Sequence, residues 1–409
     1  MVSHTLHQKM KKFTIPAELK KAGIYPYFRP IEENLDTEVI IGGKKVLMFG
    51  SNSYMGLTNH PKVKEAARVA LERYGSSCSG SRFLNGTSKL HIQLEEKLAD
   101  FVGKEAALVF STGYQTNLGV VATLTGRHGV LLLDELDHAS IIEGSRLSFS
   151  RVLKFAHNDM NELENQLRSI DDDRIRMIVV DGIFSMEGDV ADLPAIVKLA
   201  NKYGAALMVD DAHALGVLGK HGEGTAAHFG LTNQVDLIMS TFSKSLASLG
   251  GFVASDKDII NYLKHNARSM IFSASIPPSA AAAALAALEI IQTEPDRLEK
   301  LWDNTRYATE TLKNLGFDVG KTETPIIPIY IRDDMTTFKF TNRLFEEGVF
   351  VNPVVSPAVK SDSSLIRMSL MATHSMKQIE QAIDKINKVA KELGVFALQD
   401  MIANGTNHR

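Results

Sequence analysis

Short apolar segments alternate with amphipathic segments through most of the first three hundred residues of the chain. Apolar runs of four to eight residues are typical of strands buried on both faces, and the segments between them have helical periodicity. This alternation predicts an α/β fold in which helices cover a mainly parallel sheet. The expected strands lie at residues 106–110, 130–133, 176–181, 205–210, 235–241 and 250–254.

The pattern changes after Pro277 and Pro278, where a long Ala-rich helix is expected to begin with Ser279 as its cap. Beyond residue 297 the order is helix, strand, helix, short strand, strand and helix, which indicates a small α+β domain. The predicted organisation is therefore an N-terminal segment (1–50), a large α/β domain (51–285) and a small C-terminal domain (286–409).

Charge and cysteine content exclude several classes of protein. The 409 residues include 45 Lys plus Arg and 48 Asp plus Glu, a balance that disfavours a nucleic-acid binder or a polybasic membrane surface. With Cys78 as the single cysteine, no intrachain disulfide and no cysteine-rich metal site can form, so we expect a cytoplasmic protein without a metal centre. The most apolar stretch, 280–291, is shorter than the roughly 20 residues of a membrane span. Peripheral association with a membrane is left open.

Ligands of open α/β sheets bind at the carboxyl ends of the strands, so the residues after each apolar segment are the first candidates for a site. The strand at 205–210 ends in Asp210 and is followed by His213. Either residue alone is as readily explained as a helix cap or as a buried, hydrogen-bonded histidine. Their occurrence together at one strand end indicates a binding site.

Lys244 follows the strand at 235–241 and lies next to Ser243 and close to Thr241. A lone lysine is in most proteins a solvated surface charge. Here it follows a buried strand and precedes a pair of glycines, which allow close approach. Burial would lower the pKa of the Lys244 amine and make it nucleophilic toward a carbonyl carbon.

The turn after the strand at 106–110 opens a helix, where the backbone N–H groups of Gly113 and Tyr114 suit a phosphate. Neither a Walker A loop nor a Gly-x-Gly-x-x-Gly motif is present, so the usual nucleotide motifs are absent. Two further strand ends carry His138 and Ser185. His138 alone is as consistent with a core histidine as with an aromatic plate against a flat ligand.

One ligand would use all of these groups: a flat, phosphorylated pyridine that carries an aldehyde. Its aldehyde needs an amine, its ring nitrogen an anion, its ring face a plate, and its phosphate amides and hydroxyls. Pyridoxal 5′-phosphate (PLP) meets this description. The alternative from another class, a plain nucleotide-binding α/β module, lacks its phosphate motif here.

Four motifs of the chain resemble those of the α-oxoamine synthases, fold-type I PLP enzymes that condense an amino acid with an acyl-CoA and release CO2. The resemblance covers residues 28 to 393 approximately, and it implies a homodimer with its sites at the interface. The motifs are Ser-Asn-Ser-Tyr-Met-Gly-Leu at 51–57, Gly-Ser-Arg-Phe-Leu-Asn-Gly-Thr at 80–87, Asp-Asp-Ala-His at 210–213 and Thr-Phe-Ser-Lys at 241–244.

The resemblance implies a role for each matching residue. Lys244 would bind the aldehyde of the cofactor covalently and later act as general base. Asp210 would pair with the pyridine nitrogen, and His138 would stack on the ring and guide the substrate carboxylate. His213 and Ser185 would form hydrogen bonds with the ring hydroxyl.

By the same resemblance, Arg367 and Asn52 would bind the carboxylate of the amino-acid substrate. Some relatives carry a second, mobile arginine in the loop before Arg367, but residues 353–359 contain none. The phosphate would be held by Gly113, Tyr114, Thr241, Ser243 and, from the other subunit, Ser273.

The residues at 80–87, 244–252 and 367–374 are most similar to those of family members that condense L-serine with palmitoyl-CoA. That reaction gives 3-oxosphinganine for sphingolipid biosynthesis. Close rivals use glycine with acetyl-CoA, alanine with pimeloyl-CoA, or glycine with succinyl-CoA. Nothing in the residues alone measures the width of an acyl channel. A non-catalytic partner subunit is a further alternative, which the presence of Lys244 disfavours.

Overall fold

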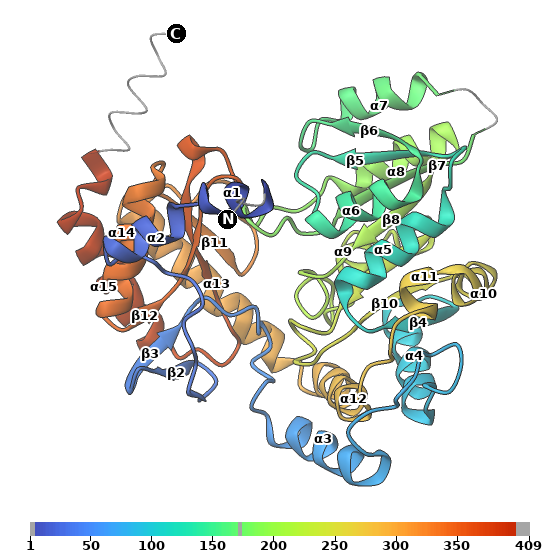
Figure 1. Cartoon of the computed structure of the whole chain (residues 1–409), viewed down its shortest axis with the longest axis horizontal. Coiled ribbons are helices and arrows are strands. Elements are labelled where there is room, and N and C mark those ends of the chain that lie inside the picture. The colour runs from blue at the N-terminus through green and yellow to red at the C-terminus, as the bar shows by residue number, and fades with distance from the viewer. Residues whose placement is uncertain (1–4, 171–173, 398–409) are drawn as a thin grey trace.

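The computed structural model describes residues 5–170 and 174–397, so the outer ends of the predicted N-terminal segment and C-terminal domain lie outside it. The chain forms two lobes, one around a seven-stranded sheet and one around two smaller sheets (Figure 1). The predicted combination of a large, mainly parallel α/β domain with a small α+β domain is confirmed. The boundaries at residues 50 and 285 stay a prediction.

The large sheet has the strand order β4-β10-β9-β8-β7-β5-β6. Strand β10 is antiparallel to both of its neighbours, and all other pairs are parallel. All six predicted strands are present within two residues of their expected ends, and β6 was not expected. The strands are Ala106–Phe110 (β4), Val130–Asp134 (β5), Arg151–Phe155 (β6), Arg176–Asp181 (β7), Ala206–Asp210 (β8), Leu237–Thr241 (β9) and Gly251–Ser255 (β10).

Alternate residues of each strand face opposite sides of the sheet, and both sides are apolar. In β5, for example, Val130 and Leu132 join one core cluster, and Leu131 and Leu133 join the other. The first cluster is closed by α3 (Pro61–Tyr74), α4 (Lys89–Val102), α7 (Met160–Arg168), α8 (Leu193–Tyr203), α9 (Thr225–His228) and α12 (Pro278–Thr293). The second is closed by α5 (Gly113–Leu124), α6 (Ala139–Ser148), α10 (Lys257–Asn266) and α11 (Arg268–Ile271).

The start of α12 differs from the sequence prediction. Pro277 occupies the N-cap position, Pro278 is the first helical residue, and no side chain caps the helix, so the expected cap by Ser279 is wrong. Proline suits this place because its φ is already helical and its missing N–H would have no partner in the first turn. The helix therefore begins without a hydroxyl cap.

The small lobe contains two sheets and draws on both ends of the chain. Strand β3 pairs in parallel with β12, so residues 33–48 share a sheet with the C-terminal part. One sheet contains β1 (Glu33–Asn34), β2 (Glu38–Ile41), β3 (Lys44–Met48) and β12 (Val349–Phe350), and the other β11 (Ile326–Tyr330), β14 (Leu365–Ser369) and β13 (Asn352–Val354). The helices are α13 (Asp296–Asn314), α14 (Asp334–Glu346) and α15 (Met376–Glu392).

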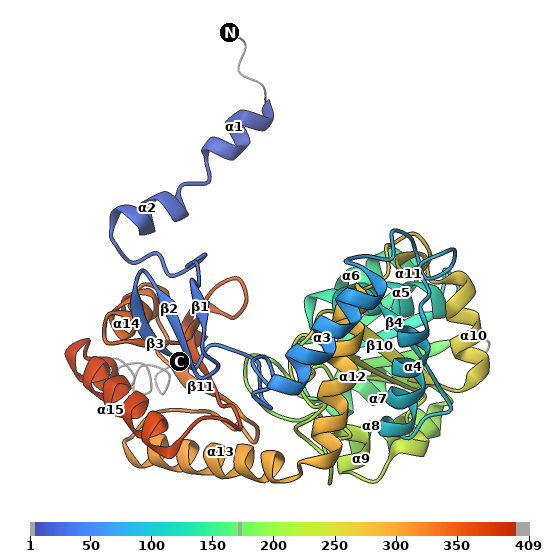
Figure 2. The same ribbon diagram turned by 90° about the horizontal axis from the view of Figure 1, so that it is seen from below.

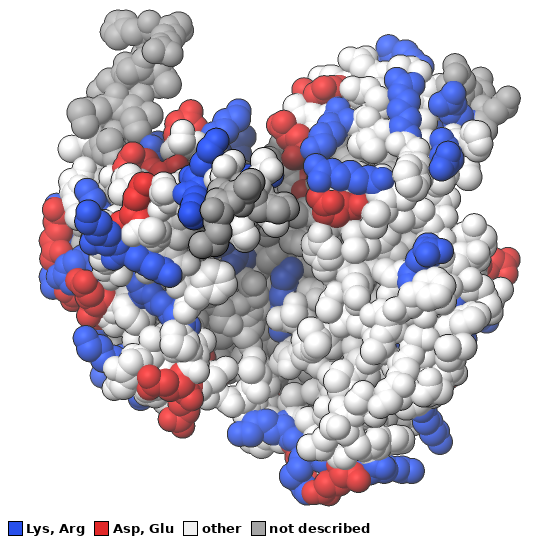
Figure 3. Space-filling view, viewed as in Figure 1, with Lys and Arg blue, Asp and Glu red and all other residues white. Residues whose placement is uncertain are grey.

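Two short helices, α1 (Thr5–Lys11) and α2 (Ile15–Lys21), precede the small lobe. Helix α1 extends away from it (Figure 2), and Leu19 of α2 joins a small core cluster with Phe338 of α14. Between the lobes the surface is hollowed, and basic side chains are visible inside the hollow (Figure 3). No helix in residues 5–170 or 174–397 combines the length and apolarity that crossing a bilayer requires. The loop after β7 contacts the small lobe, where Arg367 donates to the Ser185 carbonyl oxygen.

Candidate active site

A cavity of about 280 Å³ lies at the carboxyl ends of β4, β5, β7, β8 and β9. This is the edge of a parallel sheet at which ligands bind. Nine of the twelve predicted site residues line the cavity: Gly113, Tyr114, His138, Ser185, Asp210, His213, Thr241, Ser243 and Lys244. The structure thus brings together residues that are up to 131 positions apart, the span from Gly113 to Lys244.

The Lys244 amine belongs to a residue in the turn directly after β9, and it is set among groups that control its charge. Burial lowers the pKa of this amine to about 8, against the raising effect of the Asp210 and Asp181 carboxylates and together with the lowering effect of Arg367. A larger share of the amine is therefore neutral near pH 7 than for a solvated lysine. A neutral amine is the form that attacks a carbonyl carbon.

Asp210, the last residue of β8, is 3% exposed and is held at both oxygens. Oδ1 accepts from the backbone N–H of Ala212 at 2.9 Å, and Oδ2 accepts from Asn117 Nδ2 at 2.7 Å. The same Asn117 amide donates to Ser140 Oγ at 2.8 Å, and Ser140 Oγ lies 2.7 Å from His138 Nδ1. A chain of hydrogen bonds through Asn117 and Ser140 thus connects Asp210 to His138.

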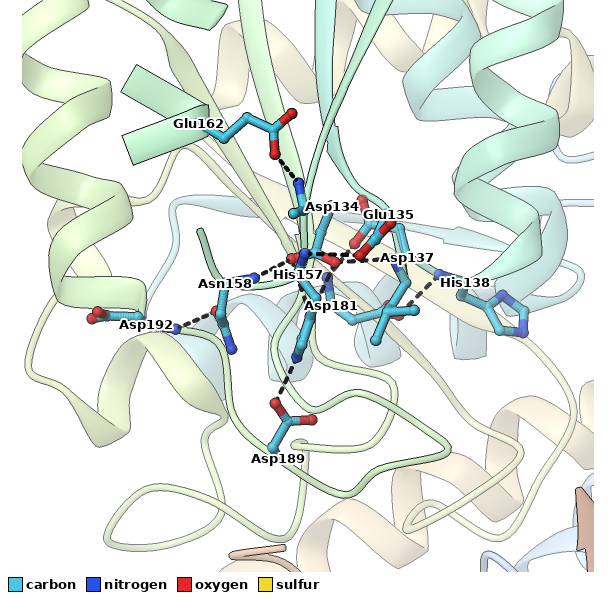
Figure 4. Close-up of polar contacts among 12 residues, drawn as sticks. Asp134, Glu135, Asp137, His138, His157, Asn158, Glu162, Asp181, Asp189 and Asp192 are labelled. Atoms are coloured by element: carbon cyan, nitrogen blue, oxygen red, sulfur yellow. Dashed lines mark hydrogen bonds and ion pairs between the residues drawn. The ribbon is translucent and has the colours of Figure 1, made fainter. Parts of the chain in front are cut away.

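His138 is the N-cap residue of α6, and a second carboxylate holds its backbone. The His138 N–H donates to Asp181 Oδ2 at 2.9 Å (Figure 4). Burial raises the pKa of Asp181 well above its ordinary value, and the nearby charge of Asp210 adds to the effect. Desolvation lowers the pKa of His138, against the effect of Asp210, so its ring is mainly neutral at pH 7. A neutral imidazole suits stacking on a ring.

The turn from β4 into α5 lies directly against the end of β9. A Cβ atom on Gly113 would come within 2.7 Å of Thr241 Cβ, so only glycine allows this approach. Within the described chain, no hydrogen bond is found for the backbone N–H of Gly113 or Tyr114, which are among the free donors of a helix start. Thr241 Oγ1 lies 3.0 Å from Ser243 Oγ. Amides and hydroxyls of this kind suit a phosphate.

On the small-lobe side, Arg367 in β14 is 5% exposed and forms three contacts. Its Nε donates to the Ser185 carbonyl oxygen at 2.7 Å, its Nη1 to Asn52 Oδ1 at 2.8 Å, and its Nη2 to Tyr54 Oη at 3.2 Å. The same Tyr54 oxygen lies 2.7 Å from His213 Nδ1. Arg367 and Asn52, although outside the cavity wall, are therefore connected to the cavity residues His213 and Ser185.

His213 is buried, and its environment keeps it neutral. Burial lowers the pKa of His213 well below its usual value, and the positive charges of Lys244 and Arg367 lower it further. Ser273, the twelfth predicted residue, does not line the cavity of its own chain, and its Oγ accepts from Gln115 Nε2 at 3.1 Å. Its predicted role, on the phosphate of the other subunit, stays a prediction.

Four residues with contacts in this site were not predicted as site residues. Asp181 ends its strand beside Asp210 in the sheet register, so the strand-end rule could have found it. Asn117 follows Gly113 by one helical turn, and a buried asparagine in an apolar helix is a signal of the same kind. Ser140 and Tyr54 become visible only once the fold places them.

The residues fit PLP. A buried carboxylate on Asp210 matches a ring nitrogen that must stay protonated, the free amides at the start of α5 match a phosphate, and Lys244 supplies the amine. Fold and site together define a PLP-dependent transferase of fold type I.

Comparison with known proteins gives the family. Residues 44–386 match the model of the class I and II aminotransferases. The chain is 59% identical to a serine palmitoyltransferase of Sphingobacterium spiritivorum over 96% of this chain and 98% of that protein. An 8-amino-7-oxononanoate synthase of Thermoanaerobacter pseudethanolicus is 43% identical over 93% and 96%. A solved serine palmitoyltransferase from S. paucimobilis, with PLP and myriocin bound, superposes with a TM-score of 0.93 at 34% identity and covers 96% of this chain and all of that one. The chain belongs to the α-oxoamine synthases within the class I and II aminotransferase family.

Proposed function

We propose that the chain condenses L-serine with palmitoyl-CoA to give 3-oxosphinganine, CoA and CO2. The carbon–carbon bond forms between serine Cα and the thioester carbon, CoA leaves as the thiol, and the serine carboxylate is lost as CO2. The observation that carries the proposal is that Lys244 and Asp210 line the same cavity. The Arg367 guanidinium contacts Ser185, another residue of the cavity lining. The choice of serine and a palmitoyl chain is supported by the 59% identity to a serine palmitoyltransferase.

PLP, when bound, supplies an electron-accepting pyridine ring that stabilises negative charge at the amino-acid Cα. The chain's own residues then have two tasks. Lys244, whose amine has its pKa lowered to about 8 and so is partly neutral near pH 8, removes the Cα proton as general base. Asp210 places a fixed negative charge in a buried position, where it favours the protonated ring nitrogen.

The carboxylate of serine would be bound by Arg367 and Asn52. A guanidinium offers two parallel N–H donors, which match a carboxylate. Tyr54 and the Ser185 carbonyl fix the orientation of the guanidinium. His138, whose ring is held through Ser140, would stack on the pyridine ring and guide the carboxylate.

We further propose that the protein acts as a cytoplasmic homodimer. Ser273 lies outside the cavity of its own chain, which supports a role for it on the phosphate bound by a second subunit. Sedimentation of the holoenzyme tests the dimer. In mixed dimers, a Ser273→Ala chain should weaken the site of the other subunit.

The proposed reaction is tested by its stoichiometry. Purified holoenzyme is incubated with L-serine labelled at its carboxyl carbon and with palmitoyl-CoA, and free thiol, labelled CO2 and the long-chain ketone are measured together. The proposal expects equal amounts of the three products. Thiol release without CO2 would indicate thioester hydrolysis instead, and absence of all three would exclude the reaction.

A further inference from the structure

The loop of residues 182–190, between β7 and α8, is a contact between the two lobes. The small lobe holds it through backbone carbonyls. Arg367 Nε donates to the Ser185 oxygen at 2.7 Å, and Thr324 Oγ1 donates to the Gly188 oxygen at 2.8 Å. The position of the Arg367 guanidinium therefore depends on where the backbone of this loop lies.

The loop is closed by its own hydrogen bonds. The Phe184 N–H donates to the Asp189 carbonyl at 3.0 Å, and the Gly188 N–H donates to the Phe184 carbonyl at 2.9 Å. Residues 184 to 189 thus form one tight turn with Ser185 in it. An interaction that fixes Asp189 therefore also fixes the Ser185 carbonyl, which accepts a hydrogen bond from Arg367.

His157, which follows β6, provides this interaction with Asp189. Its Nδ1 lies 3.0 Å from Asp134 Oδ1 at the end of β5, and its Nε2 lies 2.7 Å from Asp189 Oδ2 (Figure 4). Its ring also meets the Phe184 ring edge-on, with the centroids 4.4 Å apart. Since each ring nitrogen faces a carboxylate, only the protonated imidazolium can donate to both.

The charges around His157 agree with this protonation state. Burial lowers its pKa, but the hydrogen bonds and charges of Asp134 and Asp189 outweigh burial and raise the pKa to about 10. The other charged groups nearby are also acidic: Glu135, whose Oε1 accepts from the His157 backbone N–H at 3.3 Å, and Glu187 in the loop.

Asp189 depends on His157 for its side-chain contact. Its Oδ1 is buried without a hydrogen-bond partner in the described chain, and its Oδ2 contacts His157. Without the imidazolium, a partly buried carboxylate would lose its counter-charge. It would turn toward water and take the loop backbone with it.

We propose that His157 is a positioning residue for Arg367: by bridging Asp134 and Asp189 it fixes the 182–190 loop, and so sets the guanidinium that binds the substrate carboxylate. This inference rests on the proposed function, in which Arg367 binds that carboxylate. It assigns His157 no contact with substrate or cofactor.

The test compares L-serine with ethanolamine, which is the same amine without the carboxylate. Both are titrated into holoenzyme, and binding is followed by the absorbance of the bound cofactor. In His157→Gln we expect the dissociation constant of serine to rise about tenfold and that of ethanolamine to change less than twofold, because only serine uses Arg367. Asp189→Asn should act in the same direction. The control is His128→Gln. His128 is an exposed histidine just before the start of β5, and Asp134 lies at the other end of that strand.

Equal weakening of both ligands, or no weakening of either, would overturn the proposal, because a merely structural role does not distinguish them. If His157→Gln fails to fold, the same comparison in Asp189→Asn decides. If the unmodified protein binds another amino acid and not serine, the proposed substrate is wrong. That amino acid and its decarboxylated amine then test His157 in the same way.

Discussion

Asn117 Nδ2 donates a hydrogen bond of 2.7 Å to Asp210 Oδ2, which connects the middle of α5 to the end of β8. Hydrogen bonds to a charged acceptor are stronger than neutral ones, and here both partners are buried. Because the same amide reaches Ser140, and through it His138, Asn117 couples the residue assigned to the ring nitrogen to the residue assigned to the ring face.

Asn117→Ala should therefore weaken cofactor binding. Loss of one buried hydrogen bond to a charged group costs about 1.5–3 kcal/mol, which corresponds to a rise of roughly tenfold to a hundredfold in the dissociation constant of PLP. The measurement is a titration of apo-protein with PLP. Thr123→Ala, at the far end of α5, is the matched control and should bind normally. An Asn117→Ala protein that binds PLP as tightly as its parent would contradict this account.

The sequence predicted the large sheet well because its strands are buried on both faces and appear as continuous apolar runs. Strand β6 could not be found in this way, since it is an edge strand whose sequence RVLKF buries only Phe155 fully. It becomes a strand because β5 offers it hydrogen-bonding partners. That information is not local to residues 151–155.

The site residues divide in the same way, into those that local sequence patterns predict and those that only the fold brings together. The strand-end rule located Lys244, Asp210 and His138, because each lies at the end of an apolar run or within a few residues after it. The contact between Arg367 and Tyr54 joins residues 313 positions apart, and only the fold brings them together. Arg367 was predicted by resemblance alone. Local sequence patterns predict which side chains lie at the carboxyl edge of the large sheet. They do not predict how the small lobe packs against that edge.

The pH dependence of cofactor capture tests the environment of Lys244. Because burial lowers the pKa of its amine to about 8, the neutral nucleophilic form increases as the pH rises through that value. The rate at which apo-protein binds PLP should therefore rise between about pH 7 and 9 and then level off. Stopped-flow absorbance measures this rate. A rate that keeps rising to pH 10.5 would show an amine with the ordinary lysine pKa.

Arg367→Lys keeps the positive charge but removes the planar fork. We expect the KM for L-serine to rise by roughly tenfold to a hundredfold, with a smaller change in kcat, because a lysine cannot form two parallel bonds to a carboxylate. Steady-state kinetics with varied serine measure this change. Arg306→Lys, in an exposed ion pair with Asp303, is the control. An unchanged KM would remove Arg367 from carboxylate binding.

The His157 bridge makes a pH-dependent contribution to stability. Its folded pKa, about 10, lies above the ordinary value of 6.5, so the contribution is fully present below about pH 6.5 and is lost as the pH rises through about 10. Denaturant unfolding should give a wild-type advantage over His157→Gln on the order of 3 kcal/mol at pH 6. The advantage should shrink steadily toward pH 10. A difference that does not vary with pH would mean that His157 is not charged in the folded protein.

The central claim, condensation of serine with a long acyl chain at Lys244, is tested most directly by competition. Holoenzyme receives L-serine, glycine and L-alanine at equal concentration together with palmitoyl-, pimeloyl- and acetyl-CoA, and the ketone products are identified by mass spectrometry. The account predicts 3-oxosphinganine as the dominant product, and no ketone from Lys244→Ala. A dominant product from glycine or alanine, or undiminished product from Lys244→Ala, would contradict it.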